Sequence, residues 1–199
     1  MKAVLFDLFG VIAHVQSPEA RTALERAAGI DPERFRAAYW SHRPPYDRGE
    51  VTAAAYWQAV CAPSGPPLDR ARTEELIATD LAGWSGTDRR MVDLLGGLAD
   101  RGVVLGLLSN IPEELAAHYE STHPWLELFA VRGLSCRIGS AKPEPAAYLW
   151  CVRALGLPPE EILFVDDRPE NVRAARRLGL RGHVFTSPED LRTVLERTG

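Results

Sequence analysis

Four groups of polar residues, far apart in the sequence, have side chains that could together perform phosphoryl transfer. Three groups directly follow short apolar runs, and the fourth is a lysine that precedes a proline: Asp7, Ser109 with Asn110, Asp166 with Asp167, and Lys142. Carboxylates placed close together resist ionisation unless a cation joins them. An oxygen-only cluster favours a hard cation, and Mg²⁺ characteristically combines one or two protein carboxylates with water and a substrate phosphate. The aspartates therefore predict a Mg²⁺ site.

The same residues supply the remaining parts of a phosphoryl-transfer site. A carboxylate such as Asp7 can attack phosphorus and form an acyl phosphate, which water then hydrolyses. The Ser109 hydroxyl, a backbone amide and Lys142 can hold the other phosphate oxygens. Each residue alone is more typical of a turn, a helix cap or a solvated loop. Their order along the chain and their placement at strand ends favour a single site.

Buried apolar strands that alternate with helices would position these groups. Strands are predicted at residues 3–6, 103–108 and 162–165, with weaker ones near 129–131 and 184–185. Helices are predicted over residues 87–100 (with Thr87 as N-cap), 112–120, 143–155, 169–178 and from 187 onward. This alternation indicates an α/β fold with a doubly wound, Rossmann-like parallel sheet. Ligands of such sheets bind beyond the carboxyl ends of the strands, where the polar groups would meet.

Residues 17–80 have a different character. They are rich in alanine, arginine, glutamate and aromatic residues, and proline and glycine clusters break them at HRPPYDRG and APSGPP. The pattern predicts short helices, packed on one another and inserted into the core after the first strand.

Composition narrows the possible partners. The chain has 199 residues, a formal net charge of −4 and no apolar run long enough to span a membrane, so neither nucleic acid nor a membrane is an expected partner. Three cysteines, none in a C-x-x-C pair, predict reduced thiols and a cytoplasmic location. The sequence does not indicate an oligomeric state.

Four segments resemble the sequence motifs of the haloacid dehalogenase superfamily of aspartate-nucleophile hydrolases. They are LFDLFGVI, LLSN, AKPEPAAY and FVDDRPENV, in the family's order and across essentially the whole chain. The helical segment resembles the small four-helix cap of the family's first cap class. Within it, YDRGEVTAAAYW is similar to a segment that is common in the caps of the family's small sugar-phosphate phosphatase branch. The resemblance implies a Rossmann-like core of residues 1–13 and 84–199 and a cap of residues 14–83. Hinges would lie near residues 13–15 and 82–85.

The resemblance also implies roles for individual residues. Asp7 would be the nucleophile, and Ser109, Asn110 and Lys142 would bind the phosphoryl group. Lys142 would also hold the nucleophile. The metal ligands would be Asp7, Asp166, Asp167 and the backbone carbonyl of Phe9, and Asn171 would support them.

Phe9 departs from the phosphatase pattern, which usually has an aspartate there as general acid and base. Dehalogenases of the superfamily often have an aromatic residue at this position. Loss of proton delivery typically costs about 10² to 10⁴ in rate, so the chain should prefer leaving groups that need little protonation. Water or a residue of the cap, such as His14, could also take over that role.

The leading hypothesis is a Mg²⁺-dependent phosphatase of a small phosphorylated metabolite that works through an aspartyl-phosphate on Asp7. The acid pair favours it over a 2-haloacid dehalogenase, because halide release needs neither a metal nor a proton. A catalytically degenerate, ligand-binding relative is a further alternative. A receiver domain fits poorly, because its acid pair precedes its nucleophile.

Overall fold

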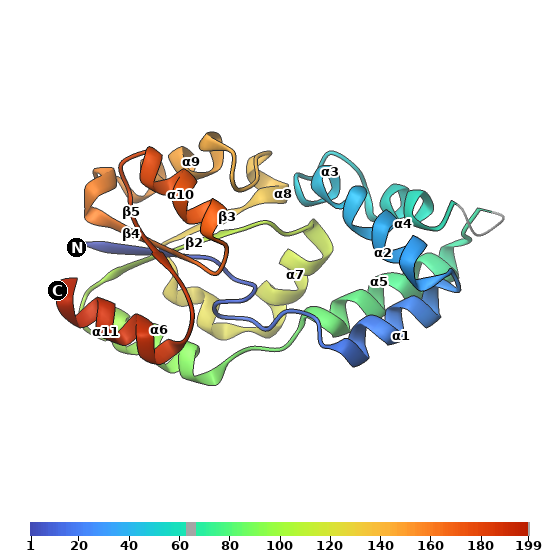
Figure 1. The fold of residues 1–199 in the computed structure, drawn as a ribbon, viewed down its shortest axis with the longest axis horizontal. Coiled ribbons are helices and arrows are strands. Elements are labelled where there is room, and N and C mark those ends of the chain that lie inside the picture. The colour runs from blue at the N-terminus through green and yellow to red at the C-terminus, as the bar shows by residue number, and fades with distance from the viewer. Residues whose placement is uncertain (63–66, 199) are drawn as a thin grey trace.

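The structure is a computed structural model that describes residues 1–62 and 67–198. Its centre is a five-stranded sheet (Figure 1). All pairings between the strands are parallel, in the order β3-β2-β1-β4-β5. The strands are β1 (Ala3–Phe6), β2 (Val104–Ser109), β3 (Val131–Leu134), β4 (Ile162–Asp166) and β5 (Arg181–Val184). Phe6 pairs with Leu107 on one side and Val165 on the other, so the three central strands end side by side. The predicted doubly wound α/β fold is confirmed.

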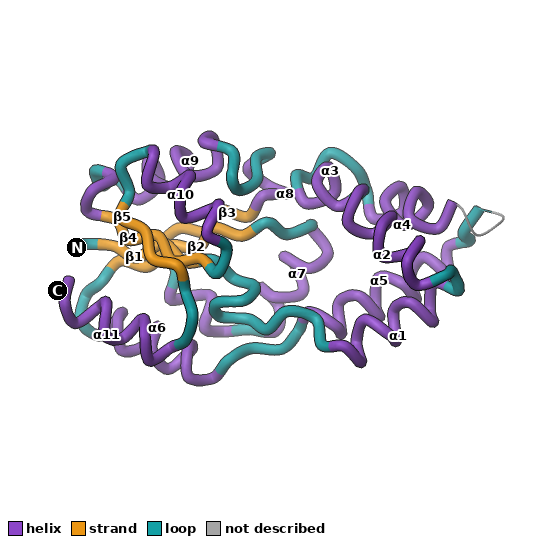
Figure 2. Tube along the Cα trace, viewed as in Figure 1, coloured by secondary structure: helices purple, strands orange, loops and turns teal. Residues whose placement is uncertain are grey.

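Helices cover both faces of the sheet (Figure 2). One face carries α6 (Arg89–Asp100), α7 (Glu113–Thr122) and α11 (Pro188–Thr198), and the other carries α9 (Pro145–Leu155) and α10 (Pro169–Arg177). Side chains of β1 alternate between these faces, as the pleat of a strand requires. Val4 and Phe6 belong to the buried cluster under α6, whereas Ala3 and Leu5 belong to the cluster under α9 and α10. The short elements α8 (Ser135–Ile138), η2 (Pro124–Leu128) and η3 (Pro159–Glu161) complete the core.

A group of helices lies between β1 and α6 in the sequence and beyond one end of the sheet in space (Figure 1). This helical insert consists, in the described residues, of α1 (Pro18–Ala28), α2 (Pro32–Ser41), α3 (Arg43–Asp47), α4 (Ala53–Cys61) and α5 (Arg70–Trp84). Its own buried cluster contains aromatic side chains of three helices, including Phe35, Tyr46 and Trp57. Four helices were expected here, and α3 is an additional single turn in the HRPPYDRG break. Residues 63–66 of the APSGPP break lie outside the described residues.

Several element boundaries differ from those predicted. Asp88 rather than Thr87 is the N-cap of α6, because its carboxylate accepts the backbone N–H of Arg90. The helix predicted from residue 143 begins at Pro145, which leaves Lys142 in the preceding loop. Strand β5 ends at residue 184 instead of beginning there. No described helix combines the length and apolar character that crossing a bilayer requires.

Candidate active site

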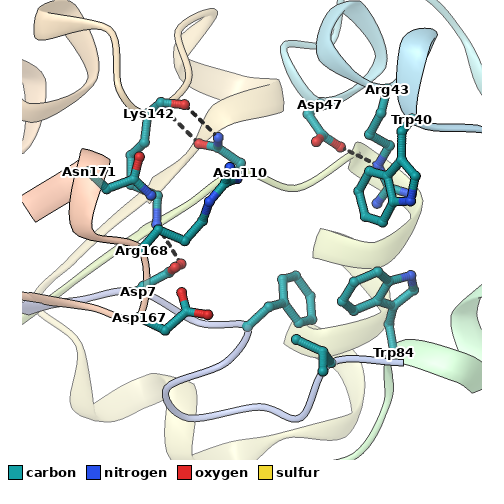
Figure 3. A pocket seen from close by; sticks show the side chains of 12 residues that line it. Asp7, Trp40, Arg43, Asp47, Trp84, Asn110, Lys142, Asp167, Arg168 and Asn171 are labelled. Carbon is teal, nitrogen blue, oxygen red and sulfur yellow. Dashed lines mark hydrogen bonds and ion pairs between the residues drawn. The ribbon is translucent and has the colours of Figure 1, made fainter. Parts of the chain in front are cut away.

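Three carboxylates meet at the carboxyl end of the sheet. Asp7 follows β1, Asp166 is the last residue of β4, and Asp167 follows it. One oxygen from each lies within 4.8 Å of the others. The structure therefore brings together side chains that are separated by about 160 residues of sequence. Figure 3 shows Asp7 and Asp167 side by side, with Lys142 above them.

Lys142 is the cation of this cluster. Its Nζ lies 2.5 Å from Asp7 Oδ1 and 2.8 Å from Asp166 Oδ2, and its side chain is almost fully buried. The side chain of Asn110 fixes the loop that carries it, because Oδ1 accepts the N–H of Lys142 and Nδ2 donates to its carbonyl, both at 2.8 Å. Asn110 lines the cavity, as expected for a substrate-binding residue, but the hydrogen bonds of its side chain position Lys142.

The two central aspartates have different surroundings. Asp166 accepts hydrogen bonds from Lys142, from the N–H of Arg168 and, on both oxygens, from Asn171 Nδ2 at 3.0 Å. Asn171 therefore supports the cluster, as predicted, by orienting this carboxylate. On Asp7, both the Lys142 contact and the N–H of Leu8 converge on Oδ1. No donor among the described residues reaches Oδ2, so that oxygen is the one available for a ligand or for attack.

The electrostatics of the site favour a bound cation. Burial raises the pKa of Asp7 to about 8; Lys142 opposes this shift and Asp166 adds to it by repulsion. Burial and then repulsion from Asp166 also raise the pKa of Asp167. Burial alone would lower the pKa of Lys142, but attraction to Asp7 and Asp166 outweighs it and raises that pKa. Three carboxylates against one lysine leave excess negative charge, and an oxygen-only donor set of this kind fits Mg²⁺.

The buried hydroxyl of Ser109 fits a donor to a ligand oxygen. Its side chain is completely buried at the end of β2, and its hydroxyl has no hydrogen-bond partner among the described residues. A buried hydroxyl without a partner costs free energy, and such exceptions call for an explanation such as a ligand oxygen. The lack of a partner fits the predicted role of Ser109 as a donor to a phosphoryl group, but its side chain does not line the cavity described below.

A cavity of about 210 Å³ is lined by Asp7 and Asp167, whereas Asp166 is buried behind them. The helical insert provides part of its wall, with side chains that sequence reasoning did not identify: Trp40, Arg43, Asp47 and Trp84 (Figure 3). Arg43 Nε donates to Asp47 Oδ1 at 2.7 Å, and both side chains are largely buried. The sequence signal was the aromatic and arginine content of residues 39–47, but the packing of the insert decides which of them face the cavity. His14, in contrast, is exposed and does not line this cavity.

Residues 1–179 match the family model of haloacid dehalogenase-like hydrolases. The chemistry of the site agrees with this match. The chain belongs to the haloacid dehalogenase-like hydrolase family. It is therefore an enzyme, and its reaction class is hydrolysis.

Known proteins of similar sequence or structure match most of the chain. Hexitol phosphatase A of Escherichia coli is 26% identical over 198 residues, which cover 95% of this chain and 85% of that protein. A family enzyme from Bacteroides thetaiotaomicron, solved in complex with magnesium and inorganic phosphate, has a TM-score of 0.78 at 21% identity, covering 94% of each chain. L-2-haloacid dehalogenase from Xanthobacter autotrophicus has a TM-score of 0.69 at 20% identity, covering 92% of this chain and 76% of that one. At these identities the two solved structures show the shared fold alone.

Proposed function

We propose that the protein is a Mg²⁺-dependent phosphatase of a small phosphorylated metabolite, with Asp7 as the nucleophile. The observation that carries this proposal is the convergence of three carboxylate oxygens within 4.8 Å, beside Lys142. The similarity to a hexitol phosphatase supports the phosphatase reaction. The family enzyme that was solved with magnesium and inorganic phosphate supports the choice of ion and ligand.

In the first step, Oδ2 of Asp7 attacks the phosphorus atom while Lys142 holds Oδ1. A bond forms between Asp7 and phosphorus, and the ester oxygen leaves with the electron pair of the bond that breaks. The Ser109 hydroxyl donates a hydrogen bond to a phosphoryl oxygen. Asp7, Asp166, Asp167 and the backbone carbonyl of Phe9 would hold Mg²⁺, which supplies positive charge against the phosphoryl oxygens.

In the second step, water attacks the phosphorus of the aspartyl-phosphate. The bond from Asp7 to phosphorus breaks, the carboxylate recovers its electron pair, and the proton of the water passes to the released phosphate or to solvent. Lys142 again stabilises the Asp7 carboxylate as it forms. Asn171 keeps Asp166 oriented during both steps through its bonds to both oxygens.

The helical insert would act as the cap of this site. This follows the expected division of the chain into a cap of residues 14–83 and a Rossmann-like core of residues 1–13 and 84–199. Its contribution of Trp40 and Arg43 to the cavity wall supports that role. The same cap approaches the core through the hydrogen bond from Tyr46 to Glu114, at 2.7 Å. A cytoplasmic location remains a prediction.

A 2-haloacid dehalogenase is the second candidate, and one observation favours it. Phe9, two residues after Asp7, lines the cavity where an acid is usual in phosphatases. The adjacent acids argue against this candidate, because halide departure gains nothing from two further carboxylates beside Asp7. Halide release from 2-chloropropionate that is insensitive to chelator would establish the dehalogenase instead.

Phosphate release from acetyl phosphate, p-nitrophenyl phosphate and hexitol phosphates, with Mg²⁺ and with EDTA, tests the proposal. We expect phosphate release from at least one of these compounds, and we expect that release to be lost with EDTA and in Asp7→Asn. The matched control is Asp93→Asn, which removes an exposed carboxylate on α6 outside the cavity. Activity that survives in Asp7→Asn, or that is unaffected by EDTA, would refute the proposal.

A further inference from the structure

Three aromatic side chains from separate parts of the chain form one wall of the cavity. Phe9 comes from the loop after β1, Trp84 from the end of α5 and Trp40 from α2. The ring centroids of Phe9 and Trp84 are 4.9 Å apart at 65°, and those of Trp84 and Trp40 are 6.5 Å apart at 89°. Both pairs have the edge-to-face geometry that aromatic rings prefer. We call Phe9, Trp84 and Trp40 the aromatic wall.

This wall leaves apolar surface uncovered at the mouth of the cavity. Trp40 is 56% exposed and Val15, which also lines the cavity, is 57% exposed. In the described part of the chain these are the two most exposed large hydrophobic side chains. Exposed apolar surface beside polar catalytic groups is typical of a ligand site, and it predicts an apolar body on the ligand.

Among the described residues that line the cavity, the carboxylates are Asp7 and Asp167, which belong to the carboxylate cluster, and Asp47. Phe9 occupies the position two residues after the nucleophile. Asp47, the one carboxylate that the helical insert brings to the cavity, is held by Arg43 Nε at 2.7 Å. We therefore expect a leaving oxygen to depart as an anion. This is far easier for a phenol, with a pKa of about 10, than for an oxygen whose pKa is close to that of water, about 15.7.

From these two independent observations we propose that the substrates are aryl phosphates, in which a single aromatic ring lies on the aromatic wall. The proposal rests on the phosphatase function proposed above and names its substrate class. A cavity of about 210 Å³ has room for one ring, since a cavity of about 150 Å³ in another protein accommodates benzene. Arg43 and Asp47 line the same cavity and suit a ring with polar substituents.

The reaction balances without a general acid. Asp7 Oδ2 forms a bond to phosphorus, and the bond from phosphorus to the aryl oxygen breaks. The phenolate leaves with the electron pair and takes its proton from solvent. Water then hydrolyses the aspartyl-phosphate, so the products are a phenol and inorganic phosphate.

A matched set of three phosphate esters and one acyl phosphate separates the role of the ring from that of the leaving group. Phenyl phosphate has both an aromatic ring and a stable leaving anion, benzyl phosphate has only the ring, acetyl phosphate has only the good leaving group, and glycerol phosphate has neither. Among the three esters, with Mg²⁺, we expect the highest kcat/KM for phenyl phosphate. Benzyl phosphate should have a similar KM but a kcat about 10² or more lower. Acetyl phosphate should have a KM about tenfold higher.

Variants and binding test the wall itself. Trp40→Ala should raise KM for phenyl phosphate about tenfold more than for acetyl phosphate, and Trp40→Phe should recover most of the loss. Leu149→Ala, which removes an exposed side chain outside the cavity, is the control. In calorimetry, phenylphosphonate should bind about tenfold more tightly than methylphosphonate, and Trp40→Ala should abolish the difference.

The possible failures are distinguishable. If glycerol phosphate is hydrolysed with Mg²⁺ at a kcat/KM equal to or above that of phenyl phosphate, or if acetyl phosphate has a KM equal to or below that of phenyl phosphate, the aryl preference is overturned while the phosphatase function stands. Equal binding of the two phosphonates also overturns it. If no compound in the set is hydrolysed with Mg²⁺, the phosphatase function itself fails.

Discussion

Replacing Gly10 with alanine should damage the metal site more than it damages the fold. Gly10 has a φ of +84°, in the left-handed region. A Cβ on this residue would lie 2.5 Å from Oδ2 and 2.8 Å from Cγ of Asp167. Such distances are far below van der Waals contact, so the Asp167 carboxylate would have to move away from Asp7 and Asp166.

The chain contains a matched control for this substitution. Gly102 has a φ of +77°, and a Cβ there would meet nothing within 4 Å. Alanine at either position takes on the same unfavourable backbone conformation, at about 1–2 kcal/mol. Alanine also reduces the conformational entropy of the unfolded chain, and this smaller effect is the same in both variants. Any difference between Gly10→Ala and Gly102→Ala therefore reports the contact with Asp167.

We expect both variants to lose about 1–2 kcal/mol in the free energy of unfolding, measured by urea denaturation with EDTA. Gly10→Ala alone should weaken Mg²⁺ binding about 10- to 100-fold, the effect typical of disturbing the groups that orient a metal ligand. Calorimetric titration with Mg²⁺ and the Mg²⁺ dependence of phosphate release both measure this difference. If the two variants have the same Mg²⁺ affinity, the reasoning that places the ion beside Asp167 is refuted.

Three further substitutions or conditions probe the same site. Phe9→Asp should raise kcat for glycerol phosphate by up to about 10² and leave kcat for acetyl phosphate unchanged, because only the alkoxide that leaves glycerol phosphate needs a proton. If kcat for glycerol phosphate does not rise in a folded variant, protons reach the leaving group by another route. Ser109→Ala should lower kcat about 10²- to 10³-fold without lowering the free energy of unfolding, since its buried hydroxyl has no partner among the described residues; a loss of stability with full activity would contradict this. In EDTA, the free energy of unfolding should fall from about pH 5 to about pH 8, because burial raises the pKa of Asp7 to about 8 and the folded protein keeps a proton that the unfolded chain releases. Asp7→Asn should make this pH dependence shallower, and an unchanged slope would argue against the raised pKa.

The catalytic end of the sheet could be predicted from the sequence because parallel strands align their carboxyl ends. Asp7, Ser109 and Asp166 each end or follow a buried strand, so their placement followed from the topology alone. Lys142 lies in a loop, and its approach to Asp7 depends on the clamp formed by Asn110, which no periodicity in the sequence indicates.

The wall contributed by the helical insert could not be predicted in the same way. Trp40 and Tyr39 are adjacent aromatic residues on α2, yet Tyr39 is buried in the insert and Trp40 reaches the cavity. Which residue faces the core depends on how the insert docks, not on its local pattern. Strand β5 was misplaced for a related reason. Its sequence, RGHV, has no apolar run, because an edge strand is only partly covered.

The most direct measurement is the mass of the protein after acid quenching during turnover of acetyl phosphate with Mg²⁺. The proposed mechanism predicts the added mass of one phosphoryl group, located on the peptide that contains Asp7. It also predicts that Asp7→Asn carries no label and that Asp93→Asn is labelled like the unmodified protein. Turnover without any phosphoryl label, or a label on a peptide that lacks Asp7, would contradict the assignment of Asp7 as the nucleophile.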